Sequence, residues 1–149
     1  MDRTLTGQEL VDTARAIAVD AHADQQDKAG APYIGHPARV AGRLDDDVAR
    51  AVAWLHDVLE DTPVTEDDLH RAGFPAEVVA TVRALTRRDD EPLDDHLARV
   101  RAHGELAVRV KLADVADNAD PTRLARLEPA TRARLEAKYA RTRAALDRG

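Results

Sequence analysis

The sequence predicts an all-α protein, a compact helical bundle in which residues 1–149 form one domain. Apolar residues recur along most segments with the 3.6-residue period of an amphipathic helix, and no segment alternates apolar and polar residues for long enough to predict a strand. Gly and Pro fall between the periodic segments, where helices are expected to end. A chain of 149 residues can bury one core without disulfides, and this chain has no cysteine.

In the first part of the chain, polar residues mark the helix starts. Thr6 is followed three positions later by Glu9, a spacing that predicts a capping box. Pro37 suits the first turn of a helix because its missing N–H would have no intrahelical partner there. The acidic residues 45–47 suit a helix start because carboxylates are stabilised near the positive end of the helix dipole. Helices are therefore expected over residues 6–22, 36–44 and 45–62, with a loop over residues 27–35.

The rest of the chain shows similar boundaries. Thr65 with Asp68 predicts an N-terminal cap, and Gly73 predicts the end of that short helix. Residues 87–92 are charged and lack an apolar face, so they predict a loop that can form the rim of a site. Pro121 interrupts the later helical pattern. Helices are expected over residues 65–72, 75–85, 93–102, 106–118 and 129–146.

Composition excludes several classes of function. The formal net charge of −6 argues against broad binding to a phosphate backbone, so nucleic acid is not expected as a partner. No apolar run is long enough to span a membrane, and residues 1–10 lack the plan of a signal peptide, so we expect a cytoplasmic protein. Without cysteine, metal binding or acid–base chemistry falls to histidine and carboxylates. The sequence leaves the oligomeric state open.

Four ionisable residues interrupt the apolar pattern of the helix expected over residues 45–62: His56, Asp57, Glu60 and Asp61. Burying such groups is costly unless something compensates them. His56 and Glu60 are four residues apart, as are Asp57 and Asp61, so on one helix the two pairs would project along adjacent stripes. A bound divalent cation would offset their charge.

A second apolar helix, expected over residues 106–118, carries Lys111, Asp114 and Asn118. Asp114 and Asn118 share a face, and Lys111 lies one turn earlier. A buried carboxylate with no neighbouring partner in sequence needs one from elsewhere in the fold. His36 follows the constrained loop and completes the candidate groups. The same patterns predict solvated side chains for His70, His96 and His103 and a hydrogen-bonded structural role for His22.

Taken in chain order, these blocks resemble the HD-domain metal-dependent phosphohydrolases. More narrowly, the segments Gly-Ala-Pro-Tyr-Ile-Gly-His-Pro and Leu-His-Asp-Val-Leu-Glu-Asp-Thr resemble those of small alarmone (guanosine tetraphosphate) hydrolases and of the hydrolase domains of bifunctional alarmone enzymes. The resemblance covers about residues 14–124. Its blocks are His36-Pro37, His56-Asp57 with Glu60-Asp61, and Lys-Leu-Ala-Asp over residues 111–114 with Asn118.

The resemblance implies a helical bundle of the HD-domain type that hydrolyses the 3′-diphosphate of a (p)ppGpp-like alarmone with a metal-activated water. Such a metal lowers the pKa of its water and polarises the phosphoryl group. Glu60 and Asp61 would orient or deprotonate the water. The cofactor would be one divalent ion, most often manganese (Mn²⁺) in this family. Its implied ligands are His36, His56, Asp57 and Asp114.

The resemblance also implies a small-molecule nucleotide as the partner. Lys28 and Lys111 would stabilise phosphate charge, and Asn118 would touch the sugar or a phosphate. Tyr33 would line the base pocket or anchor its loop through the hydroxyl.

Three acidic residues depart from the alarmone hydrolase pattern: Asp27, Asp117 and Asp120. That pattern commonly has a basic residue at the first and third of these positions and an aromatic residue or His at the second. The added negative charge keeps two alternatives open. One is a phosphatase of a less charged nucleotide, such as a nucleoside monophosphate or NADPH. The other is a non-catalytic nucleotide-binding HD domain.

Overall fold

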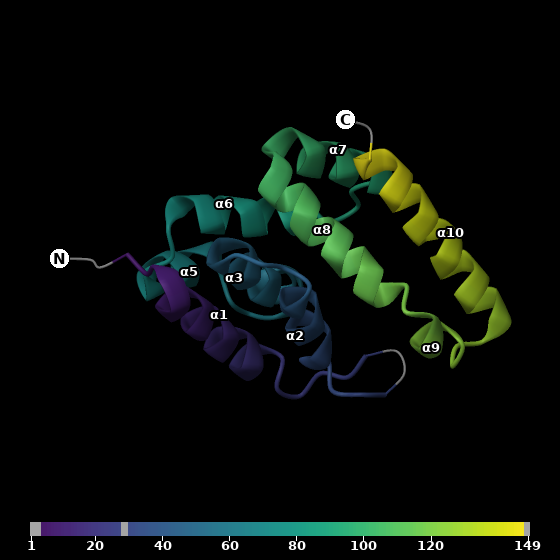
Figure 1. Ribbon diagram of the computed structural model, residues 1–149, viewed down its shortest axis with the longest axis horizontal. Coiled ribbons are helices and arrows are strands. Elements are labelled where there is room, and N and C mark those ends of the chain that lie inside the picture. Colours follow the sequence, from purple (N-terminus) through teal and green to yellow (C-terminus); the bar gives the residue numbers. More distant parts are fainter. Residues whose placement is uncertain (1–3, 28–29, 148–149) are drawn as a thin grey trace.

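A computed structural model describes residues 4–27 and 30–147, and over these residues the chain is all-α, as predicted (Figure 1). The described residues contain no strand beyond an isolated bridge between Gln26 and Pro32. No helix among them is long and apolar enough to cross a membrane. The helices are α1 Gly7–Ala21, α2 Gly35–Gly42, α3 Asp47–Leu55, α4 Val58–Asp61, α5 Glu66–Ala72, α6 Ala76–Leu85, α7 Leu93–His103, α8 Glu105–Asn118, α9 Pro121–Leu124 and α10 Pro129–Leu146.

The short helix α3 lies at the centre of the core. It packs against α1, α2, α6 and α8, so nearly every side of it is covered (Figure 1). Its sequence suits this position because its buried residues are alanines, a valine and a leucine, which carry no polar side-chain atom. Asp46 caps it by accepting a hydrogen bond from the N–H of Ala49 at 2.8 Å. The packing of α3 also holds its C-terminal end within the core, and His56 follows directly after that end.

The predicted continuous helix over residues 45–62 is wrong, because the chain breaks at His56 and Asp57 into α3 and α4. The Ala53 carbonyl, which a continuing helix would use for the N–H of Asp57, accepts from His56 Nδ1 at 2.6 Å and from the His56 N–H at 3.4 Å. A new helix then begins, with the N–H of Asp61 bonded to the Asp57 carbonyl. The expected side-chain stripes are therefore replaced by a turn that aims His56 and Asp57 inward.

The last helices form a second side of the molecule. Helix α8 contacts α2 and α3 on one side and α10 on the other, and Figure 1 shows it crossing the middle of the view. Gly104, with a φ of 128°, makes the turn from α7 to α8 in a conformation that other residues rarely adopt. Helix α10 packs on α7 and α8 and buries Leu135, Thr142 and Leu146. It thus lies opposite α2 and α3 across α8.

Of the two predicted caps, the structure confirms one. Thr65 and Asp68 form a capping box, and Gly73 ends α5 with a φ of 103°. Thr6 stands at the N-cap of α1, but its side chain makes no capping hydrogen bond, so the capping box predicted there is wrong.

One histidine expected in solvent is buried. His96 is 2% exposed beneath the charged loop, where its Nδ1 lies 3.4 Å from Arg99 Nη2 and 3.7 Å from Glu91 Oε1. Burial, with the charge of nearby cations, lowers the pKa of His96 to about 4. The other assignments hold: His70 and His103 are exposed, and buried His22 donates from Nδ1 to Gln25 Oε1 at 2.9 Å.

We expect Thr65→Ala to lower the free energy of unfolding by about 1 kcal/mol, because it leaves an amide of α5 without its capping partner. Thr6→Ala is the matched control and should change it by less than about 0.5 kcal/mol. Urea denaturation followed by circular dichroism measures both. Equal losses for the two variants would contradict this assignment of the caps.

Candidate metal centre and cleft

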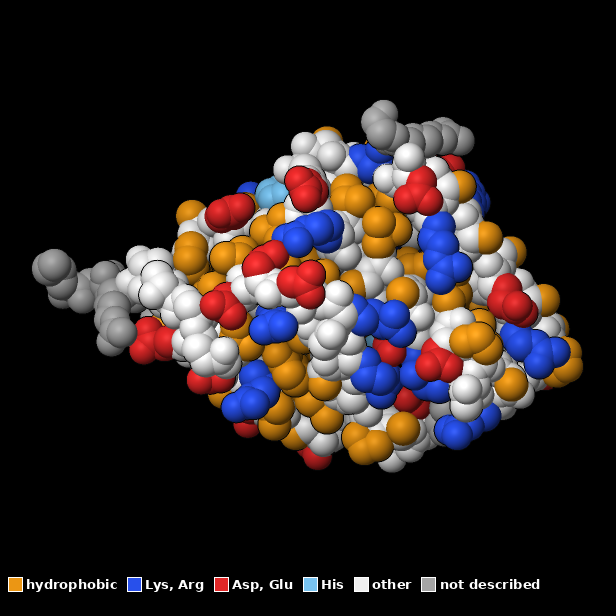
Figure 2. All heavy atoms as spheres, viewed as in Figure 1, with side chains coloured by type: hydrophobic (Ala, Val, Ile, Leu, Met, Phe, Trp, Pro, Cys, Tyr) orange, Lys and Arg blue, Asp and Glu red, His pale blue; other side chains and the backbone are white. Residues whose placement is uncertain are grey.

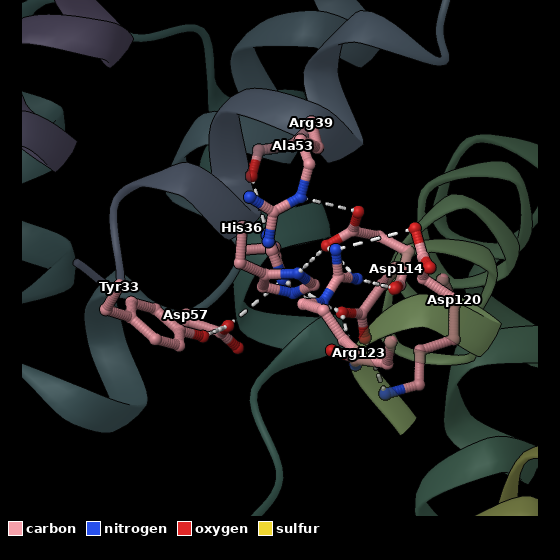
Figure 3. A network of polar contacts seen from close by, with 12 residues as sticks. Tyr33, His36, Arg39, Ala53, Asp57, Asp114, Asp120 and Arg123 are labelled. Carbon is pink, nitrogen blue, oxygen red and sulfur yellow. Dashed lines mark hydrogen bonds and ion pairs between the residues drawn. The ribbon is translucent and has the colours of Figure 1, made fainter. Parts of the chain in front are cut away.

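The four predicted metal ligands come from distant parts of the chain and meet at one point. Figure 3 labels three of them, His36, Asp57 and Asp114. His36 lies in the first turn of α2, His56 and Asp57 form the turn between α3 and α4, and Asp114 lies in α8. His36 Nε2 is 2.7 Å from Asp114 Oδ1. His56 Nε2 is 3.0 Å from Asp57 Oδ2 and 3.3 Å from Asp114 Oδ1.

Both imidazole rings are held through Nδ1. His56 Nδ1 donates to the Ala53 carbonyl, and His36 Nδ1 donates to Asp117 Oδ2 at 2.6 Å. Each ring therefore directs Nε2 toward the carboxylates. His56 Nε2 is buried and makes no well-aligned hydrogen bond, although two carboxylates lie near it.

The carboxylates create a strongly negative environment for the two histidines. Burial alone would lower the pKa of His56, but the charges of Asp57 and Asp114 outweigh it and raise the pKa well above its ordinary value. Burial likewise opposes the charge of Asp114, yet Lys111 and His56 hold its pKa well below the ordinary range. A positive charge, whether a proton or a metal ion, is therefore stabilised at this point.

The donor set fits a divalent metal ion. His36, His56 and Asp57 can each offer one donor atom, and these atoms lie within 4.8 Å of one another. Asp114 approaches the same imidazole nitrogens through Oδ1. Imidazole nitrogen and carboxylate oxygen are common ligands of divalent transition metals, and the unpaired Nε2 of His56 would find a partner in such an ion. The described residues thus support a divalent metal site.

Tyr33 supports this centre from the loop before α2. Its hydroxyl donates a hydrogen bond to Asp57 Oδ2. Its ring lies between those of His22 and His36, with centroid distances of 4.9 Å and 5.8 Å. Burial and the charge of Asp57 raise the pKa of Tyr33 well above its ordinary value, so the hydroxyl keeps its proton. The structure thus gives the hydroxyl to Asp57, while the ring lines the neighbouring cavity.

A cavity of about 490 Å³ opens beside the centre. Figure 2 shows basic side chains gathered around acidic ones near the middle of this face of the molecule. The loop before α2 and the turn at His56 line one side, and α8, α9 and α10 line the other. Its polar lining includes Tyr33, His36, His56, Asp57, Glu60, Asp61, Arg87, His96, Lys111, Asp114, Asn118, Arg123, Lys138 and Tyr139.

Glu60 and Asp61, the two predicted catalytic carboxylates, lie on α4 at the rim of this cavity. Glu60 Oε1 accepts a hydrogen bond from the N–H of Arg87 at 2.8 Å, which anchors it to the charged loop. Gln25 Nε2 donates to the Asp61 carbonyl at 2.8 Å and fixes the end of α4. Partial withdrawal from water raises the pKa of both carboxylates, and the charge of Asp57 adds to this effect. They are thus biased toward accepting a proton.

The residues predicted to contact substrate lie close to Asp114. Lys111 Nζ is 3.3 Å from Asp114 Oδ2, and Asn118 Nδ2 donates to Asp114 Oδ1 at 3.2 Å. Both side chains also line the cavity, so they link Asp114, a predicted metal ligand, to the space for a bound molecule. Lys28 lies outside the described residues.

The three acidic departures do not act as bare negative charges. Asp117 is 1% exposed; it accepts from Arg39 Nε at 2.8 Å, and Arg123 Nη2 lies 3.2 Å from its Oδ2. These bonds and that to His36 outweigh burial and lower the pKa of Asp117 far below its ordinary value. Asp120 caps α9 through the N–H of Thr122, and Asp27 accepts from the N–H of Ala31. The charge of Asp117 is therefore compensated within the protein, which weakens the argument that it opposes a highly charged substrate.

Helix α10 supplies a wall that the sequence analysis missed. Leu135, Lys138, Tyr139 and Thr142 all line the cavity. Their spacing of three, four and seven residues places them on one helix face. That stripe was visible in the sequence, but the sequence could not show which part of the fold it covers.

Relatives of the chain carry closely similar names. A "Probable guanosine-3′,5′-bis(diphosphate) 3′-pyrophosphohydrolase" of Synechocystis sp. is 38% identical over 90 residues, covering 58% of this chain and 12% of that protein. A "Guanosine-3′,5′-bis(diphosphate) 3′-pyrophosphohydrolase" of Vibrio cholerae is 39% identical over 106 residues, covering 68% and 14%. The "Bifunctional (p)ppGpp synthase/hydrolase SpoT" of Escherichia coli K12 is 40% identical over 81 residues, covering 51% and 11%. This chain thus spans only 11 to 14% of the length of these relatives.

A solved structure shares the fold. It is described as a metazoan orthologue of SpoT that hydrolyses ppGpp, and it matches with a TM-score of 0.76 over 97% of this chain and 89% of that one, at 21% identity. No protein-family model matches the chain. The resemblance that the motifs indicate is confirmed by these relatives in sequence and by this structure in fold.

We expect Asp57→Ala to abolish binding of a divalent ion, because it removes one ligand and the hydrogen-bond acceptor of Tyr33. In the unaltered protein, Mn²⁺ at about 100 times its dissociation constant should stabilise the fold by about 2.7 kcal/mol. Thermal unfolding with and without Mn²⁺ measures the difference. Asp94→Asn, on the exposed start of α7, is the control and should keep the full shift. An equal Mn²⁺-dependent shift in Asp57→Ala would show that the ligands are assigned wrongly.

Proposed function

Because the chain is a relative of guanosine-3′,5′-bis(diphosphate) 3′-pyrophosphohydrolases and its fold matches that of a SpoT orthologue, we propose that it is a metal-dependent phosphohydrolase. Its proposed reaction is hydrolysis of the 3′-diphosphate of (p)ppGpp-like nucleotides, with Mn²⁺ as the metal. A cytoplasmic location and a nucleotide as the partner remain predictions.

One observation carries the proposal: two imidazoles and two carboxylates converge at the side of a cavity that also holds two further carboxylates and several cations. The converging set suits a metal ion, and the cations suit phosphate. The cavity, at about 490 Å³, has the size of a site for a small molecule.

In this proposal four residues bind the ion, and hydrogen bonds from neighbouring side chains fix two of those four in place. Bound by His36, His56, Asp57 and Asp114, Mn²⁺ would supply the charge that acidifies a water molecule and polarises a phosphoryl oxygen. Tyr33 fixes the Asp57 carboxylate through its hydroxyl hydrogen bond, so its proposed role is closer to the metal site than to the base pocket. Lys111 and Asn118 fix Asp114 from the same helix.

Glu60 is the proposed general base, with Asp61 beside it. Glu60 stands at the rim within the cavity lining, held by the N–H of Arg87, and its raised pKa brings it closer to the range in which a base both is ionised and accepts a proton readily. Asp61 is set by the bond of its carbonyl to Gln25. Among the residues that the structure describes, no hydrogen bond joins either carboxylate to one of the four ligand residues, so each can accept a hydrogen bond from a water molecule.

The basic side chains on one side of the cavity suit the phosphates of a nucleotide. Lys111, Arg123 and Lys138 line the side made by α8, α9 and α10. Since Asp117 is compensated by Arg39 and Arg123, one of the three reasons to prefer a less charged nucleotide is weakened. The alarmone is therefore the substrate that we propose, and Lys28 remains a proposed phosphate contact on the basis of the resemblance alone.

We expect the purified protein with Mn²⁺ to convert guanosine tetraphosphate to GDP and diphosphate. Chromatography of the nucleotides, with NADPH and nucleoside monophosphates in parallel, measures which bond is cut. Phosphate release from NADPH or a monophosphate, with none from the alarmone, would move the assignment to another nucleotide phosphatase. Bound metal without turnover of any nucleotide would instead indicate a binding domain.

We expect Glu60→Gln to keep the metal and to lower kcat by about 10² to 10⁴, the usual contribution of a general base. In the unaltered enzyme the rate should fall as the pH drops through the pKa of Glu60, which lies above the ordinary value for glutamate, because the protonated form cannot accept a proton. Stopped assays over a range of pH, with Mn²⁺ binding measured separately, test both points. Glu66→Gln, on α5, is the control. A full rate in Glu60→Gln would exclude Glu60 as the base.

A further inference from the structure

We propose that Asp117 is a positioning residue that holds His36 in the orientation needed to bind the metal through Nε2. This inference rests on the metal-binding part of the proposed function and adds a residue to it. The sequence alone had suggested a different role for Asp117, as a negative charge facing the substrate.

The geometry links the two residues directly. His36 Nδ1 lies 2.6 Å from Asp117 Oδ2, while His36 Nε2 points to Asp114 Oδ1 at 2.7 Å (Figure 3). Asp114 and Asp117 are three residues apart on α8, so two carboxylates on one face of this helix contact the two nitrogens of the His36 ring. A carboxylate that accepts the Nδ1 proton leaves Nε2 as the nitrogen that binds a metal, and it also makes the ring a stronger ligand.

Two arginines keep the Asp117 carboxylate in place. Arg39, from α2, donates through Nε to Asp117 Oδ1 at 2.8 Å. Arg123, from α9, donates through Nη2 to the Asp117 carbonyl, and the same nitrogen lies 3.2 Å from Asp117 Oδ2. Arg39 lies one helical turn after His36, so two neighbouring side chains of α2 both bond to the Asp117 carboxylate. Side chains from α2, α8 and α9 therefore fix the Asp117 carboxylate and, through it, the orientation of the His36 ring.

A neutral amide cannot replace this carboxylate. Both oxygens of Asp117 face donors: Arg39 at Oδ1, and His36 and Arg123 at Oδ2. In Asp117→Asn, one of the two positions becomes an NH₂ group that faces a donor, in either orientation of the amide. If the NH₂ faces the ring, it favours the tautomer that carries its proton on Nε2, where the metal binds.

The test is Mn²⁺ binding to the purified full chain by isothermal titration calorimetry. We expect Asp117→Asn to weaken Mn²⁺ affinity about 10- to 100-fold, the usual effect of removing such an outer partner. Asp46→Asn is the matched control, because Asp46, like Asp117, pairs with an arginine, Arg109, but its other partner is the backbone N–H of Ala49 and not a histidine. Its Mn²⁺ affinity should equal that of the unaltered protein.

A second variant, Asp117→Ala, removes the acceptor without adding a donor, and Arg39 and Arg123 can turn to solvent because both are already partly exposed. It should also weaken Mn²⁺ binding at least tenfold while circular dichroism shows a folded chain. The Mn²⁺ concentration for half-maximal rate should rise in both variants, with kcat at saturating Mn²⁺ changed by only a few-fold. A purely structural role would lower the melting temperature and leave the affinity unchanged.

Mn²⁺ affinity within about twofold of the unaltered protein in either folded variant would overturn the role of Asp117. This result differs from a failure of the proposed function, in which the unaltered protein itself would bind no Mn²⁺ or would turn over no nucleotide.

Discussion

The hydrogen bond from His56 Nδ1 to the Ala53 carbonyl ends α3, and the rest of the site depends on that ending. It uses the carbonyl that would continue the helix, so the chain turns and presents Asp57 beside the ring. Helix α3 packs against α1, α2, α6 and α8, and this packing holds the turn in place. A helix within the core thus sets the position of the candidate metal centre, and α4 begins after the turn with Glu60 and Asp61 at the rim.

Burial of so many charges next to the core requires compensation at each step. Asp114 is offset by Lys111 and the histidines, and Asp117 by Arg39, Arg123 and His36. A buried charge that loses its partner is far more costly than an exposed one. Although the chain as a whole has an excess of acidic residues, the buried carboxylates of Asp114 and Asp117 are paired with basic side chains. The net charge of −6 therefore says little about the electrostatic potential that a phosphate would meet in the cavity.

Sequence reasoning predicted most of the helices and the residues that converge. Helix boundaries followed from Pro, Gly and caps such as Thr65, which are local signals. The break at His56 was missed because the apolar period continues through Leu55 and Val58. The sequence pattern also cannot show that the His56 ring donates a hydrogen bond to the Ala53 carbonyl of its own helix. His96 looked solvated because its neighbours in sequence are charged, although the loop that carries Glu91 folds over it. The pairing of Asp117 with Arg39 joins positions 78 residues apart, a distance at which a single sequence gives no signal.

The cavity has two sides of different origin. The candidate-site residues Tyr33, His56, Asp57 and Glu60 belong to the segments around α2 to α4, whereas Lys138 and Tyr139 belong to α10, which packs on α7 and α8. Leu135 and Thr142 of its cavity-facing stripe are buried, whereas Lys138 is exposed and Tyr139 is half-buried, so only the last two can change with little effect on the core. The cavity wall can therefore vary at these two positions while the candidate metal centre stays as it is.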